Sequence, residues 1–326
     1  MNEDTCNFIR QAAADPSWGL AHRESFGLML HYWQRDQIPH LAAFCGDARP
    51  RTLEEIPSVP VGLFKEGLDF CAGEPAHTFL TSGTTQGRRG AHSLPSLDAY
   101  NLGAELWWRA QVPGCPTRVI SLVPSPEQAP ESSLGHMVAH FASQRQDLFD
   151  MERGVDHAGC WAALSQASEP VFVAATAFSM AHLLERPGQV QLPEGSVVMV
   201  TGGFKGRTTQ LSAQQLRAEI PVRLGAPVVE EYGMTELSSQ LWGREGRFVA
   251  PPWMKVYTVD PLTGTPTRDQ GLLRFVDLAN FGSCLSIETE DLGIVSGQEV
   301  TLLGRLSTAP HRGCSLSAEE AAQWQI

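Results

Sequence analysis

Short apolar runs alternate with stretches of helical periodicity through the middle of the chain. The runs rich in Val, Ile and other apolar residues span 118–124, 170–175, 196–201 and 226–232. Apolar residues at helical spacing precede the first run at 97–108 and lie between later runs at 132–141 and 178–184. Strands that alternate with helices predict an α/β fold with a mainly parallel sheet.

The two ends of the chain have a different pattern. Residues 1–50 carry apolar positions at helical spacing, and 51–70 contain prolines typical of an extended connection. From about Phe248 onward shorter strands and turns predict a β-rich portion, for example at 271–276 and 300–303. We therefore expect a helical N-terminal segment (1–60), a core (61–303) and a C-terminal tail (304–326).

A polar loop interrupts the pattern at Thr78–Gly90, directly after the apolar start of a predicted strand. It contains hydroxyl residues, glycines and the pair Arg88 and Arg89. Glycines let backbone N–H groups converge on an anion, and arginine matches phosphate oxygens. The loop alone fits a nucleotide triphosphate or a polar surface turn equally well.

Composition narrows the class of protein. The chain has 326 residues, 42% hydrophobic and 18% charged, a net charge of −12 and a pI near 5.3. This acidic balance argues against a nucleic-acid or membrane-surface binder, and no window approaches the length of a membrane span. Seven cysteines without a CxxC pair, and an N-terminus unlike a signal peptide, predict reduced thiols in a cytoplasmic protein.

Several familiar catalytic patterns are absent from the sequence. The loop lacks the Walker A spacing, and no GxGxxG, HExxH, GxSxG or paired-cysteine zinc pattern occurs. Two other polar segments have ordinary structural explanations when each is taken alone. Glu231–Glu236 could be a strand end with a helix N-cap at Thr235, and Glu288–Gly293 could be a turn.

Five segments in a fixed order nevertheless resemble the motifs of the adenylate-forming (ANL) superfamily. They are Thr81-Ser-Gly-Thr-Thr85, Thr201-Gly-Gly-Phe-Lys-Gly206, Glu231-Tyr-Gly-Met-Thr-Glu236, Glu288-Thr-Glu-Asp-Leu-Gly293 and Leu303-Gly-Arg305. Each is weak alone, and their joint order is a strong signal. The resemblance implies an ANL-type adenylation core that uses ATP and Mg²⁺ to activate a carboxylic acid as acyl-AMP.

The resemblance also implies a role for each matching residue. Thr235 would donate to the α-phosphate, Glu236 would bind Mg²⁺, Asp291 would accept the ribose hydroxyls and Arg305 would meet ribose or phosphate. The remaining ATP-binding positions are Thr81, Ser82, Gly83, Thr84, Thr85, Gly87, Arg88, Gly202, Gly203, Tyr232 and Gly233.

One branch of the superfamily fits this chain best. The segments Val61–Lys65 and Arg312-Gly-Cys-Ser-Leu316 are similar to those of the acyl-protein synthetase (LuxE-type) branch, in which a cysteine takes the acyl group as a thioester. That cysteine would be Cys314. The short tail after Arg305 is expected to exclude the mobile C-terminal domain and its catalytic lysine, and Lys205 is the proposed substitute.

The acid and the final acceptor stay open at this level. For the acyl pocket we favour residues 174–180, including Ala175 and Phe178, with Trp242 and His136, although ordinary core packing explains these residues as well. The acceptor is either Cys314 or an external coenzyme A, carrier-protein thiol or amine. A reductase or carrier protein would then be the partner, and a non-catalytic nucleotide-binding homologue is the third alternative.

Overall fold

A computed structural model describes residues 1–81, 88–202 and 212–306, which form two compact units. Unit 1 comprises Met1–Leu106, Met234–Gln240 and the described residues from Val249 onward. Unit 2 comprises Trp107–Gly233 and Leu241–Phe248. The chain passes from the first to the second within helix α4 (Asp98–Gln111). The three functional segments expected from the sequence remain a prediction.

Three helices open unit 1, as the periodicity of residues 1–50 predicts: α1 (Asn2–Ala14), α2 (Pro16–Gln37) and α3 (Pro39–Cys45). Asp15 separates the first two, because its carboxylate accepts hydrogen bonds from the backbone N–H groups of Ser17 (3.0 Å) and Trp18 (3.1 Å). Pro16 follows at the first helical position, where its missing N–H costs nothing. The Asp-Pro pair thus ends one helix and begins the next.

The β-rich C-terminal portion forms an antiparallel sheet in unit 1. Its strands lie in the order β14 (Pro266–Thr267), β13 (Met254–Val259), β15 (Gly271–Asp277), β16 (Ser286–Ser296) and β17 (Glu299–Arg305). The short strand β1 (Val59–Pro60) pairs with β16 in parallel. The segment Glu288–Gly293 therefore lies inside a strand, and the turn considered from its sequence is wrong.

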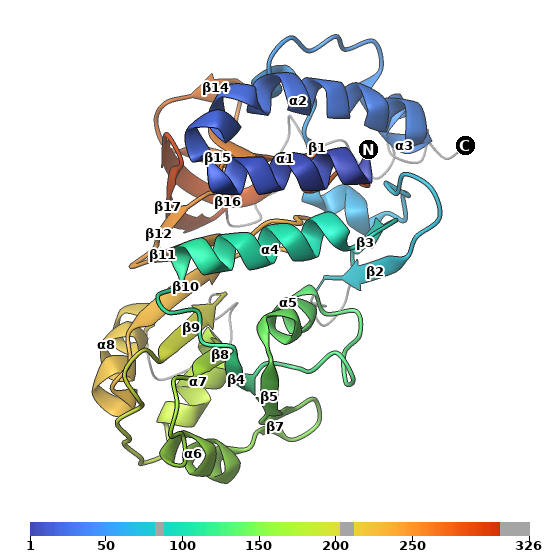
Figure 1. Cartoon of the computed structure of the whole chain (residues 1–326). Helices are drawn as coiled ribbons and strands as arrows, with labels where there is room; N and C mark the ends of the chain where they lie inside the picture. The colour runs from blue at the N-terminus through green and yellow to red at the C-terminus, as the bar shows by residue number, and fades with distance from the viewer. Residues whose placement is uncertain (82–87, 203–211, 307–326) are drawn as a thin grey trace. The chain divides into compact units, whose positions relative to one another are not determined.

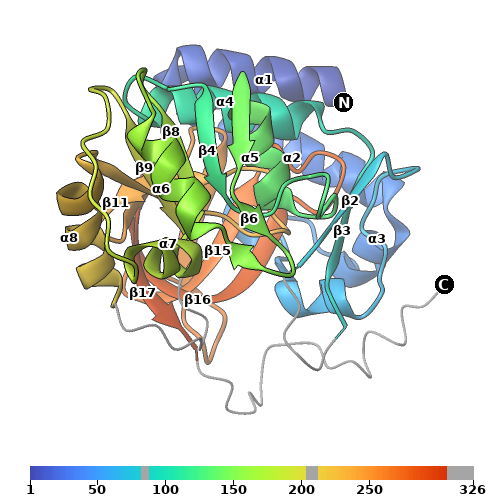
Figure 2. The ribbon, with the colours of Figure 1, turned by 90° about the horizontal axis from the view of Figure 1, so that it is seen from below.

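The connection between the helices and the sheet is less extended than expected. The 3₁₀ helices Leu53–Glu55 and Val61–Lys65 occupy much of residues 51–70. The extended form predicted for Val61–Lys65 is wrong, because Leu63 and Phe64 turn inward and are buried there. The chain then forms the antiparallel hairpin β2 (His77–Leu80) and β3 (Ala91–Leu94), whose strands lie side by side in Figure 2.

The predicted alternation of strands and helices is found in unit 2 (Figure 1). Parallel neighbours lie in the order β10 (Val228–Tyr232), β9 (Val197–Thr201), β8 (Phe172–Thr176), β4 (Arg118–Leu122) and β5 (Gln144–Asp147). Strand β11 (Leu241–Arg244) pairs antiparallel with β10 and is followed by β12 (Arg247–Val249). A small antiparallel pair, β6 (Phe149–Asp150) and β7 (Gly154–Val155), lies apart from this sheet.

Both faces of the central strands β8 and β9 are covered, which explains why their sequences are nearly continuous apolar runs. One face packs against α6 (His157–Ser165), α7 (Ala177–Leu184) and α8 (Ala213–Leu224) through a single buried cluster that includes Val173 and Val198. On the other face Phe141 of α5 (Ser133–Phe141) stacks on Trp108, with the ring centroids 4.8 Å apart. Both rings also contact Phe172 edge-on. The helices hold the carboxyl ends of the strands in a fixed arrangement.

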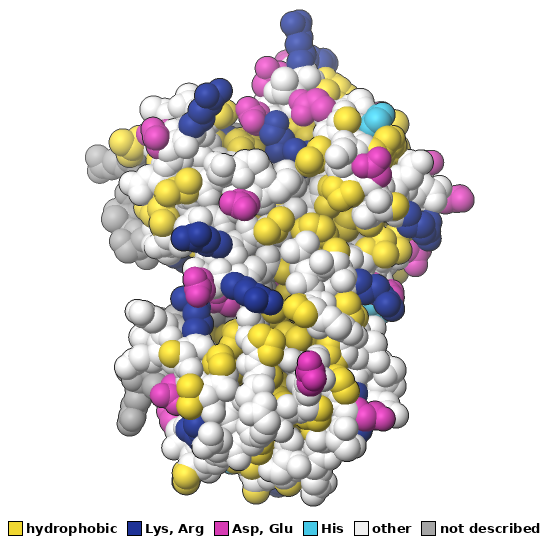
Figure 3. All heavy atoms as spheres, turned by 60° about the vertical axis from the view of Figure 1, so that its left-hand side comes forward, with side chains coloured by type: hydrophobic (Ala, Val, Ile, Leu, Met, Phe, Trp, Pro, Cys, Tyr) yellow, Lys and Arg dark blue, Asp and Glu magenta, His cyan; other side chains and the backbone are white. Residues whose placement is uncertain are grey.

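The α/β fold predicted from the sequence is thus confirmed, with mainly parallel strands in unit 2 and mainly antiparallel strands in unit 1. No helix in the described part of the chain is long and apolar enough to cross a membrane. Side chains of both charges are scattered among apolar ones on the face drawn in Figure 3.

Candidate functional site

The base of the predicted phosphate loop is closed by hydrogen bonds between its two ends in unit 1. Thr81 N donates to the Gly90 carbonyl at 2.8 Å, and Gly90 N donates to Thr81 Oγ1 at 2.8 Å. A Cβ at Gly90 would stand 3.1 Å from Thr81 Cγ2, so the two ends approach closely. Thr81 therefore closes the base of the loop against Gly90. The loop positions Ser82, Gly83, Thr84, Thr85 and Gly87 lie outside the described residues.

The two arginines of the loop have different surroundings. Arg89 donates from Nε to the Thr81 carbonyl (2.6 Å) and from Nη2 to the Leu80 carbonyl (3.2 Å). Arg88 is exposed, and its guanidinium lies against Gly67, whose φ of +81° a side chain would strain. The sequence interpretation gave both arginines charge that matches phosphate oxygens, and it placed Arg88 among the ATP-binding residues. The structure assigns Arg89 to the closure of the loop.

A hydrogen bond joins the hairpin that carries this loop to the segment that carries Thr235. His92 lies in β3, and its Nδ1 is 2.7 Å from the Thr235 carbonyl oxygen. The two residues are separated by 143 positions in the sequence. Burial lowers the pKa of His92 to about 4, so the ring is neutral at pH 7 and Nδ1 carries the proton that it donates.

The segment Met234–Gln240 is irregular, and β11 follows it. The helix with an N-cap at Thr235, considered from the sequence, is therefore wrong. The Glu236 side chain is 5% exposed, and the backbone carbonyl of Glu236 accepts a hydrogen bond from Asn280 Nδ2 at 2.8 Å. Glu236 is thus held in place by its backbone as well as by its surroundings.

Asp277 at the end of β15 anchors the rest of this segment. Its carboxylate accepts from the backbone N–H groups of Ser238 (3.0 Å) and Ser239 (2.7 Å) and from Ser239 Oγ (2.8 Å). Burial raises the pKa of Asp277 to about 6, although these donors act in the opposite direction. Sequence inspection missed Asp277, because an aspartate that ends a strand has no distinctive signal.

Helix α2 supports the same cluster through one buried side chain. Gln34 Nε2 donates to the carbonyls of Asn280 (2.7 Å) and Phe281 (3.1 Å), and Gln34 Oε1 accepts from Leu285 N (3.1 Å). The N-terminal helices thereby fix the turn that presents Asn280 to Glu236.

Two further predicted residues meet on neighbouring strands of unit 1. Asp291 in β16 is the register partner of Arg305 in β17, and Arg305 Nε donates to Asp291 Oδ1 at 2.9 Å. Asp291 is 9% exposed, whereas the Arg305 side chain is 55% exposed. The fourth and fifth motifs of the sequence therefore form one ion pair at the surface of unit 1.

The motif residues of unit 2 end two neighbouring parallel strands. Thr201 closes β9 and donates a hydrogen bond to the buried carboxyl of Glu231 in β10, and burial raises the pKa of Glu231 to about 7. Gly202 follows with φ +70°, the left-handed conformation that glycine adopts at low cost. Tyr232, half-buried, contacts the Phe248 ring at 5.9 Å, and Gly233 beside it is exposed. Gly203 and Lys205 lie outside the described residues.

The expected acyl-pocket residues fall into two groups. Ala175 is fully buried in the core of unit 2, and Trp242 is 1% exposed and contacts Phe141 at 6.3 Å, so both contribute to packing. Phe178, which contacts His182 at 4.5 Å, and His136 in α5 are partly exposed. Their roles in a pocket stay a prediction.

The strand order of unit 2 favours a position for that pocket. The strand that follows β4 lies on one side of it, and β8, β9 and β10 lie on the other, so the order reverses between β4 and β8. Ligands of open α/β sheets bind beyond the carboxyl ends of strands at such a switch point. His136 lies in the helix after β4, and Phe178 lies in the helix after β8. A Cβ at Gly135 would stand 2.5 Å from the Pro124 carbonyl oxygen, so α5 approaches the end of β4 closely.

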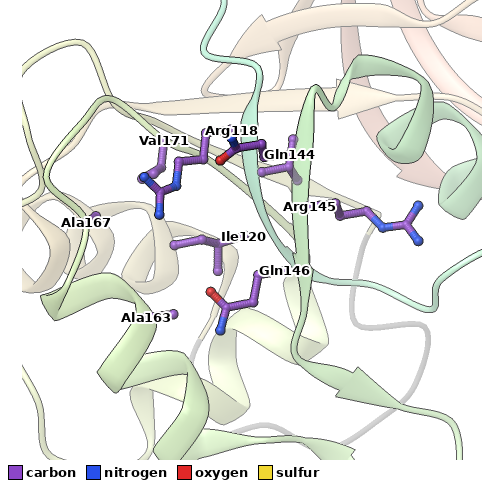
Figure 4. A pocket seen from close by; sticks show the side chains of 9 residues that line it. Arg118, Ile120, Gln144, Arg145, Gln146, Ala163, Ala167 and Val171 are labelled. Atoms are coloured by element: carbon purple, nitrogen blue, oxygen red, sulfur yellow. The ribbon is translucent and has the colours of Figure 1, made fainter.

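A hollow of about 170 Å³ lies elsewhere on unit 2 and contains none of the expected site residues. Side chains of β4, β5 and α6 contribute much of its lining (Figure 4). Arg118 pairs with Glu169, and Arg145 pairs with Glu127 and Asp147, so both positive charges are compensated. Ligand pockets usually measure about 300–1,000 Å³. We assign no function to this hollow.

A metal-binding cluster would be one route to function, but residues 1–81, 88–202 and 212–306 contain no group of three His, Cys, Asp or Glu side chains that could hold an ion. Mg²⁺ in nucleotide sites is usually bound by one or two carboxylates together with phosphate oxygens. The buried carboxyl of Glu236 could supply one carboxylate ligand of this kind.

The chain matches no protein-family model and no curated protein in sequence. Its fold, however, is similar to part of several solved structures of adenylate-forming enzymes. The 2-hydroxyisobutyryl-CoA ligase with 2-HIB-AMP and CoA bound has a TM-score of 0.61 at 16% identity, over 86% of this chain and 68% of that chain. ATP-bound MatB from Rhodopseudomonas palustris has a TM-score of 0.51 at 19% identity, over 71% and 48%.

A third similar structure is the o-succinylbenzoate coenzyme A synthetase (MenE) from Bacillus subtilis in complex with ATP and magnesium ion. Its TM-score is 0.51 at 16% identity, over 71% of this chain and 50% of that chain. The chain thus spans about half the length of MatB and MenE. At these identities the likeness establishes a shared α/β fold with adenylate-forming (ANL) enzymes, in which the described units correspond to part of the larger proteins.

Proposed function

We propose that this chain is an ATP- and Mg²⁺-dependent ligase that activates a carboxylic acid as acyl-AMP, with Cys314 as the first acceptor of the acyl group. The observation that carries the proposal is the hydrogen bond from His92 to the Thr235 carbonyl. It joins the hairpin of the loop that resembles a phosphate cradle to the segment that resembles the Thr-Glu motif. Two motifs that are remote in sequence thereby become neighbours in unit 1.

The chemistry assigned to these residues is in-line substitution at phosphorus. A carboxylate oxygen of the acid attacks the α-phosphorus of ATP, the bond to the bridging oxygen of the β-phosphate breaks, and pyrophosphate leaves. Thr235 donates to an α-phosphate oxygen. Glu236 would hold Mg²⁺, which would supply positive charge to neutralise the phosphates. Lys205 is the proposed cation between the carboxylate and the α-phosphate.

The remaining ATP contacts are proposed from the motifs to which the residues belong. Asp291 accepts the ribose hydroxyls, with Arg305 beside it as a donor to ribose or phosphate. By resemblance to the motifs, Tyr232 would offer a ring face to adenine, and the Gly202-Gly203 pair would contact the other face of the base. The acid lies near His136 and Phe178, at the strand-order switch of unit 2.

The assignment of Cys314 as the acceptor is supported by the chemistry of the other six cysteines. Cys6, Cys45, Cys71, Cys160 and Cys284 are buried, and Cys115 is partly buried. Burial raises the pKa of every one of these thiols, for example to about 11 for Cys45 and to about 12 for Cys160. A raised pKa leaves little thiolate, the reactive form, at neutral pH.

Transfer to Cys314 is the second step of the proposal. The Cys314 sulfur attacks the acyl carbonyl of acyl-AMP, a thioester forms, AMP leaves and the thiol proton passes to solvent. The second candidate keeps adenylation and uses an external thiol, and it is favoured by the fold shared with a ligase crystallised with both an acyl-AMP and CoA.

Mass spectrometry of the full chain tests both steps. The chain is incubated with ATP, Mg²⁺ and a panel of fatty and aromatic acids, and intact and peptide masses are recorded. We expect a hydroxylamine-labile acyl adduct on Cys314. The variant Cys314→Ser should lose the adduct and still release pyrophosphate in the first turnover, whereas the control Cys115→Ser should keep both.

The alternatives give different results in the same experiment. Acid-dependent pyrophosphate release from a chain that stays unmodified supports an external acceptor. Absence of pyrophosphate release with every acid contradicts adenylation and supports a nucleotide-binding homologue without catalytic activity.

A further inference from the structure

His92 lies in β3, the strand of the unit 1 hairpin that follows the phosphate loop. It lies two residues after Gly90, where the phosphate loop closes, and its register partner in β2 is Phe79. The strand that carries His92 is therefore fixed to the strand that leads into the loop. Any contact that His92 makes with another segment places that segment relative to the base of the loop.

The bond to Thr235 defines the tautomer of the His92 ring. A carbonyl oxygen can only accept, so Nδ1 must donate its proton across the 2.7 Å to Thr235. The side chain is 1% exposed, and Nε2 is buried without a partner among the described residues. Nδ1 thus makes the bond, while Nε2 remains a buried acceptor.

Packing alone does not account for a histidine at this position. The Phe64 ring meets the imidazole edge-on, with centroids 5.8 Å apart, so an apolar side chain of similar size would suit these neighbours. An apolar residue would also avoid the cost of the buried, unpaired Nε2. The feature that only a polar residue supplies here is the hydrogen bond to Thr235.

Thr235 needs such a bond because its segment has no regular backbone ladder. Asn280 holds the carbonyl of Glu236, and Asp277 holds the N–H groups of Ser238 and Ser239. These contacts fix the later part of the segment. His92 fixes Thr235, the residue before Glu236, and the Thr235 hydroxyl is the proposed donor to the α-phosphate.

We propose that His92 is a positioning residue for adenylation, which holds Thr235 at a set distance from the base of the phosphate loop. This role rests on the proposed function of Thr235. His92 touches no reacting atom, and it acts through the Thr235 backbone. Its loss should therefore lower the rate of the chemical step more than the affinity for ATP.

Two amide variants of similar polarity test this role. In His92→Asn the side-chain amide nitrogen can occupy the position of Nδ1, whereas in His92→Gln it extends toward the position of Nε2. We expect H92Q to lower kcat of acid-dependent ATP–pyrophosphate exchange by up to about 100-fold, because small misplacements of reacting groups have effects of this size. H92N should recover most of that loss, and KM for ATP should change little in either variant.

Two controls separate positioning from general structural damage. His22→Leu removes an exposed histidine of α2 whose Nδ1 also bonds to a backbone carbonyl, that of Trp18 at 2.8 Å, and should leave kcat unchanged. Thermal unfolding shows whether each variant is folded. In a Thr235→Val background, which has already lost the hydroxyl, H92Q should cause little further loss of kcat.

Each result decides the proposal. H92N and H92Q with equal kcat, or fully multiplicative effects of H92Q and Thr235→Val, would overturn the role of His92 and leave adenylation standing. A folded wild-type chain without exchange for any acid would overturn the proposed function and this role with it. If H92Q unfolds, a folded H92N with kcat reduced about 100-fold would also overturn the role.

Discussion

Asp291 and Arg305 form an ion pair across two neighbouring strands, with Arg305 Nε 2.9 Å from Asp291 Oδ1. The guanidinium holds one oxygen of a carboxylate that is proposed to accept the ribose hydroxyls of ATP. The pair therefore orients the carboxylate before a ligand arrives.

We expect Asp291→Ala to lower kcat/KM for ATP by about 10- to 100-fold, the loss of charge-assisted hydrogen bonds to the ribose. Its effect on stability should stay below about 1 kcal/mol, because Arg305 is more than half exposed and solvent screens the pair. Steady-state kinetics and urea unfolding measure the two quantities. The control Arg274→Gln breaks an ion pair between β15 and β16, the one with Glu288, and should leave kcat/KM unchanged.

The two arginines of the phosphate loop should behave differently. Arg89→Met removes hydrogen bonds to two backbone carbonyls, so it should lower the free energy of unfolding by about 1–3 kcal/mol and also lower kcat/KM for ATP. Arg88→Met should raise KM for ATP and leave stability within about 0.5 kcal/mol, because Arg88 is exposed. Equal stability of the two variants in urea would contradict the role of Arg89.

The raised pKa of Glu231 predicts that replacing this residue increases the free energy of unfolding by an amount that depends on pH. Its folded pKa is raised to about 7 from 4.5, so the folded state keeps a proton that the unfolded state releases. The resulting stability is fully present below about pH 4.5 and is lost as the pH rises through 7. As the pH rises between these limits, the free energy of unfolding of Glu231→Gln should increase by roughly 3 kcal/mol relative to that of the wild type. Any weakening of the hydrogen bond from Thr201 would reduce this gain. Urea unfolding at pH 4.5 and pH 8 tests this, and a pH-independent difference would contradict it.

For His31 the predicted pH dependence of stability has the opposite sign to that for Glu231. Burial is the main cause that lowers its folded pKa to about 4 from 6.5, with a smaller effect of Arg35, so the unfolded state binds the proton more readily. Stability contributed by the neutral ring is present above about pH 6.5 and is lost as the pH falls toward 4. His31→Leu should therefore gain roughly 3 kcal/mol relative to wild type on acidification through this window. A constant difference between the two proteins from pH 7 to pH 4 would contradict the burial of a neutral His31.

The parallel part of the fold could be predicted from sequence because its strands are buried on both faces. The runs that became β8 and β9 are continuous and apolar, and helical spacing at 97–108, 132–141 and 178–184 predicted α4, α5 and α7. Helices α6 and α8 were not predicted. The 3₁₀ helix Val61–Lys65 was not predictable in this way. Pro57 and Pro60, which precede it, favour extended structure locally, but burial of Leu63 and Phe64 determines the conformation of the helix.

The candidate site shows a similar limit. Motif order selected Thr235, Glu236, Asp291 and Arg305, but it could not select the residues that hold them. His92 is a single histidine in a short strand, and its partner lies 143 residues away. Sequence patterns report local periodicity and spacing, so a contact of that separation becomes visible only after the hairpin and the segment have folded.

The central claim is that a carboxylate oxygen of the acid attacks the α-phosphorus of ATP. It is tested by incubation of the full chain with ATP, Mg²⁺ and an acid labelled with ¹⁸O in its carboxyl group, followed by mass spectrometry of the nucleotide. Adenylation followed by acyl transfer predicts AMP that carries one ¹⁸O atom from the acid. Formation of AMP without the label, or of ADP with labelled inorganic phosphate, would contradict the account.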